Sequence, residues 1–150
     1  KGTFRNHQFD KIELEVFSDD KSGLQEHLFL IAIQEYIMKA LGLHYRVLNK
    51  CTADIGEPNA RGVDIDCWMP GQDAYREVSS ADYMTDYQAR GLKTRYRDDD
   101  GQVRFVHTND ATAIVLSRIP IAIIEQNQTA EGDVIVPEVL RAYMGGKVKI

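Results

Sequence analysis

Cysteine is scarce in this sequence: Cys51 and Cys67 are the 2 cysteines among 150 residues. Neither has a CxxC partner or a nearby pair of histidines, and two cysteines are too few for the disulfide framework of a small secreted domain. We therefore expect two reduced, mostly buried thiols in a cytoplasmic protein, because free cysteine is among the most buried residue types.

Long apolar runs are absent as well. The stretch Ile119–Ile124 is far shorter than the roughly 20 apolar residues that cross a membrane. The polar start, Lys1–Asp10, does not fit a signal peptide. A membrane partner is therefore not expected. The sequence also contains no glycine-rich phosphate loop of the P-loop or dinucleotide-binding type.

Positive charge is not in excess either. The net charge is −5 at pH 7, which argues against a freestanding RNA-binding module. The apolar and charged fractions, 43% and 27%, are those of an ordinary globular protein, and 150 residues suffice for one hydrophobic core. A local basic patch is nevertheless present, formed by Arg90, Lys93, Arg95 and Arg97.

What the sequence does contain is a succession of strand and helix patterns. Apolar residues at alternate positions predict a strand from Phe9 to Val16, and helical spacing then predicts a helix from Leu24 to Leu41. Gly42 fits the position just after a helix, where the backbone is often left-handed. The residues expected to pack this helix on a sheet are Leu24, Leu28, Ile31, Ala32, Tyr36 and Met38.

Short strands dominate the middle of the chain. The pattern predicts strands at Tyr45–Leu48, Val63–Met69 and Tyr75–Ser79. A loop is expected over Asp54–Gly62, and a short helix or irregular turn over Asp82–Leu92.

A hairpin and a helix are predicted next. Asp98–Gly101 suits the turn between strands Lys93–Arg97 and Val103–His107. Asp110–Arg118 is expected to be extended, and Pro120 places the start of a helix one residue before it, because proline is tolerated in a first turn. Strands that follow strands, with few helices, predict an α+β fold with a mainly antiparallel sheet flanked by helices.

The first strand carries one candidate for a functional face. Arg5, Phe9, Lys11 and Glu13 fall at alternating positions, and such a face could hold a phosphate, a stacked base and an amine. The polar face of an edge strand has the same pattern, and this alternative stays open.

Two further candidates follow. Glu77 and Ser79 alternate onto one side of a strand, where a carboxylate beside hydroxyls suits Mg²⁺, a hard cation. Arg118 follows Asn109–Thr112 and lies at the mouth of a helix, where its guanidinium fork matches the paired oxygens of a polyphosphate. A surface salt bridge is the alternative for Arg118.

Short motifs in a fixed order carry a resemblance to a known family. Phe4–Glu13 resembles the second half of motif 2 in class II aminoacyl-tRNA synthetases of the seryl type, and further motifs follow in that family's order. They are Cys51–Gly56, Trp68–Gln72, Tyr75–Ser80, Thr85–Arg90, Phe105–Asn109, Val136–Arg141 and Tyr143–Gly146. The chain is thus similar to the seryl-tRNA synthetase family over essentially its whole length, which implies a class II catalytic fold.

The resemblance implies a role for each matched residue. Arg5 is expected to contact the ATP phosphates, Phe9 to stack on adenine, and Glu13 to hold the α-amino group of serine. Glu77, with Ser80 beside it, is expected to bind the Mg²⁺ ion that accompanies ATP.

The remaining matches complete the implied site. Arg118 is expected on the γ-phosphate, and Thr112 at the serine hydroxyl, close to Asp110, where the family frequently has Asn. Arg5, Glu77 and Arg118 are therefore the expected catalytic residues.

The implied reaction joins serine to tRNA(Ser). The serine carboxylate displaces pyrophosphate from the α-phosphorus of ATP, and the seryl group is then transferred to the tRNA. No protein nucleophile is required, so positioning and charge stabilisation supply the catalysis.

The resemblance also implies a place within a longer protein. Residues 1–150 are expected to be the carboxy-terminal portion of the catalytic domain, without motif 1, the first half of motif 2 and the amino-terminal tRNA-binding arm. The full-length parent is expected to be a homodimer, and the chain alone to be weakly active or inactive.

Two other interpretations remain. The chain could be a non-catalytic synthetase-like paralogue that binds ATP, an amino acid or a partner protein, or a half-domain with only a structural role. Retention of every matched residue argues against the paralogue, since a drifting site should lose some of them.

Overall fold

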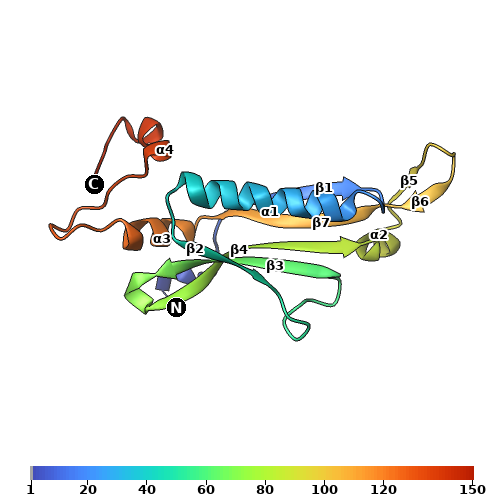
Figure 1. The fold of residues 1–150 in the computed structure, drawn as a ribbon, viewed down its shortest axis with the longest axis horizontal. Coiled ribbons are helices and arrows are strands. Elements are labelled where there is room, and N and C mark those ends of the chain that lie inside the picture. Colours follow the sequence, from blue (N-terminus) through green and yellow to red (C-terminus); the bar gives the residue numbers. More distant parts are fainter. Residues whose placement is uncertain (1) are drawn as a thin grey trace.

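The computed structural model describes residues 2–150, which are built on one five-stranded antiparallel sheet with the strand order β1-β7-β4-β3-β2 (Figure 1). A two-stranded hairpin extends from one end of the molecule. The predicted α+β fold with a mainly antiparallel sheet is confirmed. The strands are β1 Lys11–Ser18, β2 Tyr45–Asn49, β3 Arg61–Met69, β4 Ala74–Thr85, β5 Arg95–Arg97, β6 Val103–Phe105 and β7 His107–Val115.

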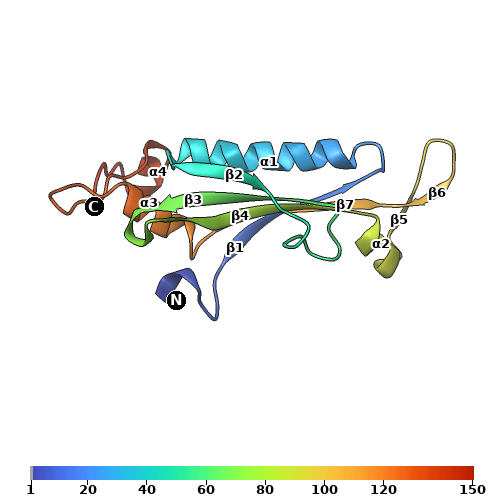
Figure 2. The same ribbon diagram turned by 60° about the horizontal axis from the view of Figure 1, so that its bottom comes forward.

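Two helices, α1 and α3, pack against one face of this sheet. The long helix α1 runs along that face, whereas the amino-terminal segment lies on the opposite side, which we call the open face (Figure 2). The α-helices are α1 Gly23–Ala40, α2 Tyr87–Leu92, α3 Ile119–Gln126 and α4 Glu138–Arg141, and the 3-10 helices are η1 Gly2–Phe4, η2 Pro70–Gln72 and η3 Ala142–Met144. Within residues 2–150, no helix is both long and apolar enough to cross a membrane.

Helix α1 ends as predicted but packs on a different side. Gly42 follows it with φ 68°, the left-handed conformation expected there. Ile31 and Met38 are buried, as predicted. Leu24, Leu28 and Tyr36 are 50%, 44% and 71% exposed, and Ala32 is exposed as well, so the assignment of these four to the buried face is wrong. The face toward the sheet contains Gly23, His27, Leu30, Ile31, Gln34 and Met38.

The physical reason is a polar contact that hydrophobic spacing does not reveal. The Gln34 side chain donates hydrogen bonds into the sheet, to the Ser79 hydroxyl and to the carbonyl oxygens of Ser80 and Thr112, at 2.7, 2.7 and 2.9 Å. A buried amide that satisfies strand carbonyls can face the core. The face of α1 that contains Gln34 therefore packs on the sheet.

Strand β4 is longer than predicted. It continues to Thr85, so the predicted helix or turn over Asp82–Leu92 is wrong for its first residues, and α2 begins at Tyr87. The reason is that β4 has a partner on each side, β3 and β7, which extends its pairing beyond the predicted end at Ser79. The β5–β6 hairpin and the start of α3, with Pro120 in its first turn, are confirmed.

The two cysteines differ from each other. Both are free thiols, as predicted, but Cys51 is exposed, so the expectation that it is buried is wrong. Cys51 lies in the turn-rich connection between β2 and β3, whose residues are mostly exposed or half-buried. Cys67 is fully buried, and burial raises its pKa to about 12, so it stays a neutral thiol.

The core consists of two groups of apolar residues between the helices and the sheet. One joins the end of α1 to α3 across β3 and β4, with Met38, Ile65, Cys67, Val78 and Ile119. The other lies under the middle of α1, with Leu30, Ile31, Val63, Ala81 and Ala111. Because Ala81 and Ala111 face α1, their neighbours on β4 and β7 point to the open face.

Candidate functional site

A bulge in the β3–β4 pairing decides which residues of β4 reach the open face. The register shift leaves Val78 without an opposite residue, and Val78 is buried beneath α1. Ser79 also faces α1, since its hydroxyl accepts a hydrogen bond from Gln34. Glu77 and Ser80 are left on the open face. The prediction that Glu77 and Ser79 share a face is therefore wrong, because simple alternation assumes an unbroken strand.

Arg118 lies against Glu77 at the start of α3. Its Nη1 donates to the carbonyl oxygen of Glu77 at 2.8 Å and lies 3.2 Å from Oε1 of the same residue. The Phe4 ring covers the guanidinium, with Cζ 5.1 Å from the ring centroid. The salt bridge considered as an alternative for Arg118 is present, but its partner is the other charged candidate.

A polar pocket of about 410 Å³ surrounds this pair. Its charged lining residues are Arg5, Arg76, Glu77 and Arg118. The structure thus brings together the three predicted catalytic residues, which come from the amino-terminal segment, β4 and the start of α3. The other lining residues are Phe4, Gln72 and Tyr75.

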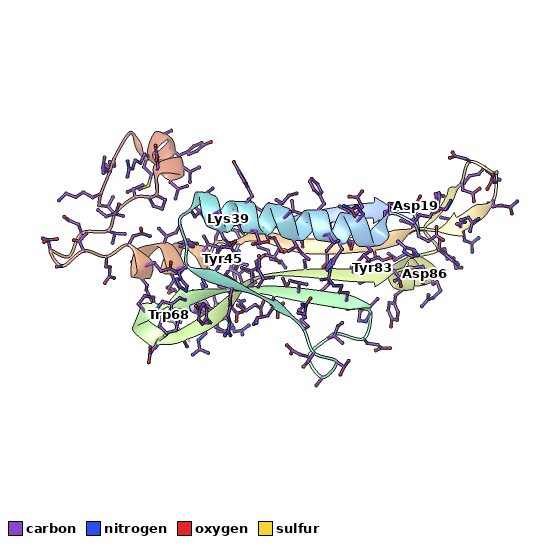
Figure 3. All side chains as sticks on the ribbon, viewed as in Figure 1. Asp19, Lys39, Tyr45, Trp68, Tyr83 and Asp86 are labelled. Carbon is purple, nitrogen blue, oxygen red and sulfur yellow. The ribbon has the colours of Figure 1, made fainter. Side chains whose placement is uncertain are left out.

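Tyr75 forms a rigid wall of this pocket. Arg46 lies over its ring, with Cζ 4.4 Å from the centroid, and Nε2 of His44 lies 2.6 Å from its hydroxyl. The Trp68 ring packs edge-on at 5.2 Å. Figure 3 shows Trp68 at the end of the molecule that also carries Tyr45, far from Tyr83. The pocket therefore belongs to this end of the sheet.

A second group of candidates meets where β1 pairs with β7. Glu13 stands directly opposite Thr112, and Oγ1 of Thr112 donates to Oε1 of Glu13 at 2.9 Å. Lys11 Nζ lies 2.5 Å from the same carboxylate oxygen. The Glu13 carboxylate thus holds both an ammonium and a hydroxyl within hydrogen-bond distance on the open face.

Asp110 is next to this group and is surrounded by acids. In the strand register it stands opposite Asp82 on β4 and opposite Glu15 on β1. Burial, followed by the charges of Asp82, Glu15 and Glu13, raises the pKa of Asp110 to about 6, although Lys11 lowers it in part. Its proton is therefore lost close to neutral pH.

A buried ion triad on the same face was not predicted from the sequence. Lys50 Nζ lies 3.2 Å from Asp64 and 3.1 Å from Asp82, and all three side chains are at most 16% exposed. Gly62 makes room for them, since a Cβ there would lie 2.6 Å from Cδ of Lys50. The three residues come from separate segments and meet only through the strand register, so no spacing in the sequence pointed to them.

The proposed common face of Arg5, Phe9, Lys11 and Glu13 is only partly formed. Strand β1 begins at Lys11, so Lys11 and Glu13 share a face, whereas Arg5 follows the turn of η1 and enters the pocket from outside the strand. Phe9 is 50% exposed and does not line the pocket. The aromatic ring at the pocket is that of Phe4.

Glu77 and Ser80 are the candidate ligands for a divalent cation at the pocket. Among residues 2–150, no group of three or more His, Cys, Asp or Glu side chains is arranged to hold a metal ion. Glu77 and Ser80 supply a carboxylate and a hydroxyl on one face. This pair suits Mg²⁺, which often takes one or two protein ligands and completes its shell with water and substrate phosphates.

Comparison with known proteins identifies the family to which this fold belongs. Residues 1–127 match the tRNA synthetase class II core domain (G, H, P, S and T). The serine–tRNA ligase of Sorangium cellulosum (strain So ce56) is 45% identical over 149 residues, which are 99% of this chain and 34% of that protein. That of Sinorhizobium medicae (strain WSM419) is 42% identical over 151 residues, 100% of this chain and 35% of that protein.

Two solved structures have the same fold over the whole chain. The seryl-tRNA synthetase from Pyrococcus horikoshii, complexed with ATP, has a TM-score of 0.96 and 44% identity and covers 100% of this chain and 34% of its own. The cytoplasmic serine-tRNA ligase from Naegleria fowleri, in complex with AMP, has a TM-score of 0.91 and 38% identity, with 99% and 35% covered. The chain spans about a third of the length of the curated relatives it matches. The match over residues 1–127 establishes that the chain belongs to the class II tRNA synthetase core domain family.

Proposed function

We propose that this chain is part of a serine–tRNA ligase, which activates serine with ATP and transfers the seryl group to tRNA(Ser). The observation that carries the proposal is the hydrogen bond from Thr112 to Glu13 on the same open face as an arginine-lined pocket. One site suits a small hydroxyl amino acid and the other a polyphosphate, and the reaction requires both.

The Glu13–Thr112 pair supplies the chemistry that serine needs. The Glu13 carboxylate can accept hydrogen bonds from the substrate ammonium, and the Thr112 hydroxyl can donate to or accept from the serine hydroxyl. A site that hydrogen-bonds a substrate hydroxyl discriminates against the analogue that lacks it, because its own polar groups are then unpaired. Asp110 lies on the same strand face and adds negative charge near the ammonium.

The arginine pocket suits the triphosphate of ATP. Arg5 and Arg118 would contact phosphate oxygens, and Phe9, half-exposed beside the pocket's amino-terminal segment, would stack on adenine. Glu77 and Ser80 would hold Mg²⁺, which neutralises phosphate charge when it is bound. Residues of the chain would thus position the serine ammonium and hydroxyl on one side and the phosphates on the other, and such positioning is the main requirement of the displacement.

The domain boundaries and partners follow from the same proposal. Residues 1–150 would form the carboxy-terminal portion of the catalytic domain in a homodimeric, cytoplasmic ligase. Because the relatives are about three times as long, we expect the chain alone to bind ligands but to support little turnover.

Calorimetry with a non-hydrolysable seryl-adenylate analogue and its alanyl counterpart tests the proposal on the chain itself. We expect the seryl analogue to bind about tenfold more tightly, the value of one hydrogen bond to a polar site. Thr112→Val should remove this preference, whereas Thr52→Val, at an exposed loop position, should leave it unchanged. Equal affinity of the unaltered chain for the two analogues would overturn the serine site. Binding of ATP without either analogue would favour the non-catalytic interpretation.

A further inference from the structure

Arg76 is a third arginine at the pocket, and the motif resemblance gives it no role. It lies on β4 between the pocket residues Tyr75 and Glu77. Its Nε donates to Oε1 of Gln72 at 2.9 Å. This neutral partner fixes the guanidinium without compensating its charge, so the remaining N–H groups stay available for an anion.

The 3-10 helix that orients Arg76 contacts the α-helix that follows Arg118. Gln72 belongs to η2, and the neighbouring Gly71 N–H donates to the Glu125 carboxylate of α3 at 2.8 Å. A Cβ at Gly71 would lie 3.2 Å from that carboxylate, so glycine permits the close approach. Because α3 begins directly after Arg118, one helix positions both arginines.

The charge of the pocket is strongly positive relative to the chain. Within residues 2–150, Arg5 and Arg76 have no carboxylate within 4.0 Å, whereas Arg118 is paired with Glu77. Two guanidinium charges are thus uncompensated, although the chain carries −5 overall. Arginine forks match the paired oxygens of phosphates, and a concave site with several of them favours a polyanion.

We propose that Arg76, oriented by Gln72, is a further phosphate-binding residue, and that it contacts the part of the triphosphate that leaves as pyrophosphate. The inference rests on the proposed function for the identity of the ligand. If this role is correct, Arg76 contributes to the affinity for ligands that carry β- and γ-phosphates, whatever adenosine or amino acid they contain.

Titration of the chain with inorganic tripolyphosphate, ATP and the seryl-adenylate analogue tests this role. Arg76→Ala should reduce the affinity for tripolyphosphate and for ATP by roughly tenfold, the typical effect of losing a hydrogen bond to a charged group. The same substitution should change the affinity for the seryl-adenylate analogue by no more than about twofold, because that ligand has no β- or γ-phosphate. Gln72→Ala should give a smaller loss with the same ligand pattern.

Arg97→Ala is the matched control, since it removes the same charge from the distant β5–β6 hairpin. Equal effects of Arg76→Ala and Arg97→Ala on tripolyphosphate would overturn the inference, as would an equal loss for all three ligands. Neither outcome bears on the proposed function, whose failure is a lack of preference for the seryl over the alanyl analogue. Thermal denaturation of each variant excludes unfolding as the cause of lost affinity.

Discussion

Gln34, on the helix that covers the sheet, donates a hydrogen bond to the carbonyl oxygen of Thr112, 2.9 Å away. The same amide reaches the carbonyl oxygen of Ser80 at 2.7 Å. Thr112 and Ser80 carry candidate serine and metal groups on the other face of the sheet. One buried side chain behind the sheet therefore fixes the backbone beneath both parts of the candidate site.

We predict that Gln34→Leu destabilises the protein by about 1–2 kcal/mol, since it removes the Gln34 donor from the Ser79 hydroxyl and from the carbonyl oxygen of Ser80. The carbonyl oxygen of Thr112 keeps the Ser79 hydroxyl as a donor. The substitution should also reduce affinity for the seryl-adenylate analogue, although Gln34 lies on the opposite face. Urea unfolding and calorimetry measure the two effects. Gln25→Leu, at an exposed position of the same helix, is the control, and equal stabilities of the two variants would contradict the prediction.

His27 should make stability depend on pH. Its side chain is fully buried, and neither ring nitrogen has a hydrogen-bond partner within residues 2–150. Burial first, then the charge of Arg61, lowers its pKa from 6.5 to about 4. Between these values the unfolded chain binds more protons than the folded protein, so the free energy of unfolding decreases as the pH falls from 6.5 to 4. The contribution is at most about 3 kcal/mol.

His27→Leu removes this titration and should flatten the profile over that interval. Urea unfolding at half-unit steps from pH 4 to 7 measures it. His7→Leu, in the exposed amino-terminal segment, provides the control. A His27→Leu profile as steep as that of the unaltered protein would show that other groups cause the dependence.

Asp110 should act in the opposite direction. Folding raises its pKa from 3.8 to about 6, so over this interval the folded protein binds more protons and its stability declines as the pH rises. At pH 7 the carboxylate is ionised beside Asp82 and Glu15. Asp110→Asn should therefore stabilise the protein at pH 7 and have less effect at pH 4.

The measurement for Asp110 is the difference in unfolding free energy between variant and unaltered protein at both pH values. Asp99→Asn, in the exposed hairpin turn, should show no such difference. A stabilisation that is the same at pH 4 and pH 7 would exclude titration of Asp110 as its source.

Much of the fold was predictable because its determinants are local. Gly42 ends α1 at the predicted place, and Pro120 lies in the first turn of α3, since each fixes the backbone by its own covalent geometry. The rotation of α1 was not predictable. It depends on hydrogen bonds between Gln34 and strand carbonyls more than 40 residues away in the chain, which no periodicity records.

Some features of the candidate site were likewise predictable from the sequence, and others were not. Arg5, Glu77 and Arg118 were recognised from motifs, and the structure places them at one pocket. The face shared by Glu77 and Ser80 was not derivable from alternation, because it depends on the bulge at Val78. A bulge is set by how two strands pair, and this pairing is a property of the sheet.

The buried ion triad depends on the close approach of Lys50 to Gly62. A Cβ on residue 62 would lie 2.6 Å from Cδ of Lys50 and 2.7 Å from Oδ1 of Asp82. Gly62→Ala should therefore displace the ammonium from Asp64 and Asp82 and lower the free energy of unfolding. This loss should exceed the roughly 0.5–1 kcal/mol of stability that alanine otherwise gains over glycine in a strand. Lys50→Met should be more destabilising, by about 3 kcal/mol, because two mostly buried carboxylates then lose their cation.

A double-mutant cycle decides whether Gly62 acts through Lys50. If Gly62→Ala destabilises the protein by breaking the triad, it should have little further effect in the Lys50→Met variant, where the triad is already lost. The losses of unfolding free energy should then be strongly non-additive in urea unfolding. Gly91→Ala is the control: a Cβ there meets nothing within 4 Å, so its effect should add to that of Lys50→Met. Additive losses for Gly62→Ala and Lys50→Met would mean that the glycine is required for the backbone alone. Non-additive losses would identify the close approach at Gly62 as the condition under which three charges from separate segments can be buried together beside the site.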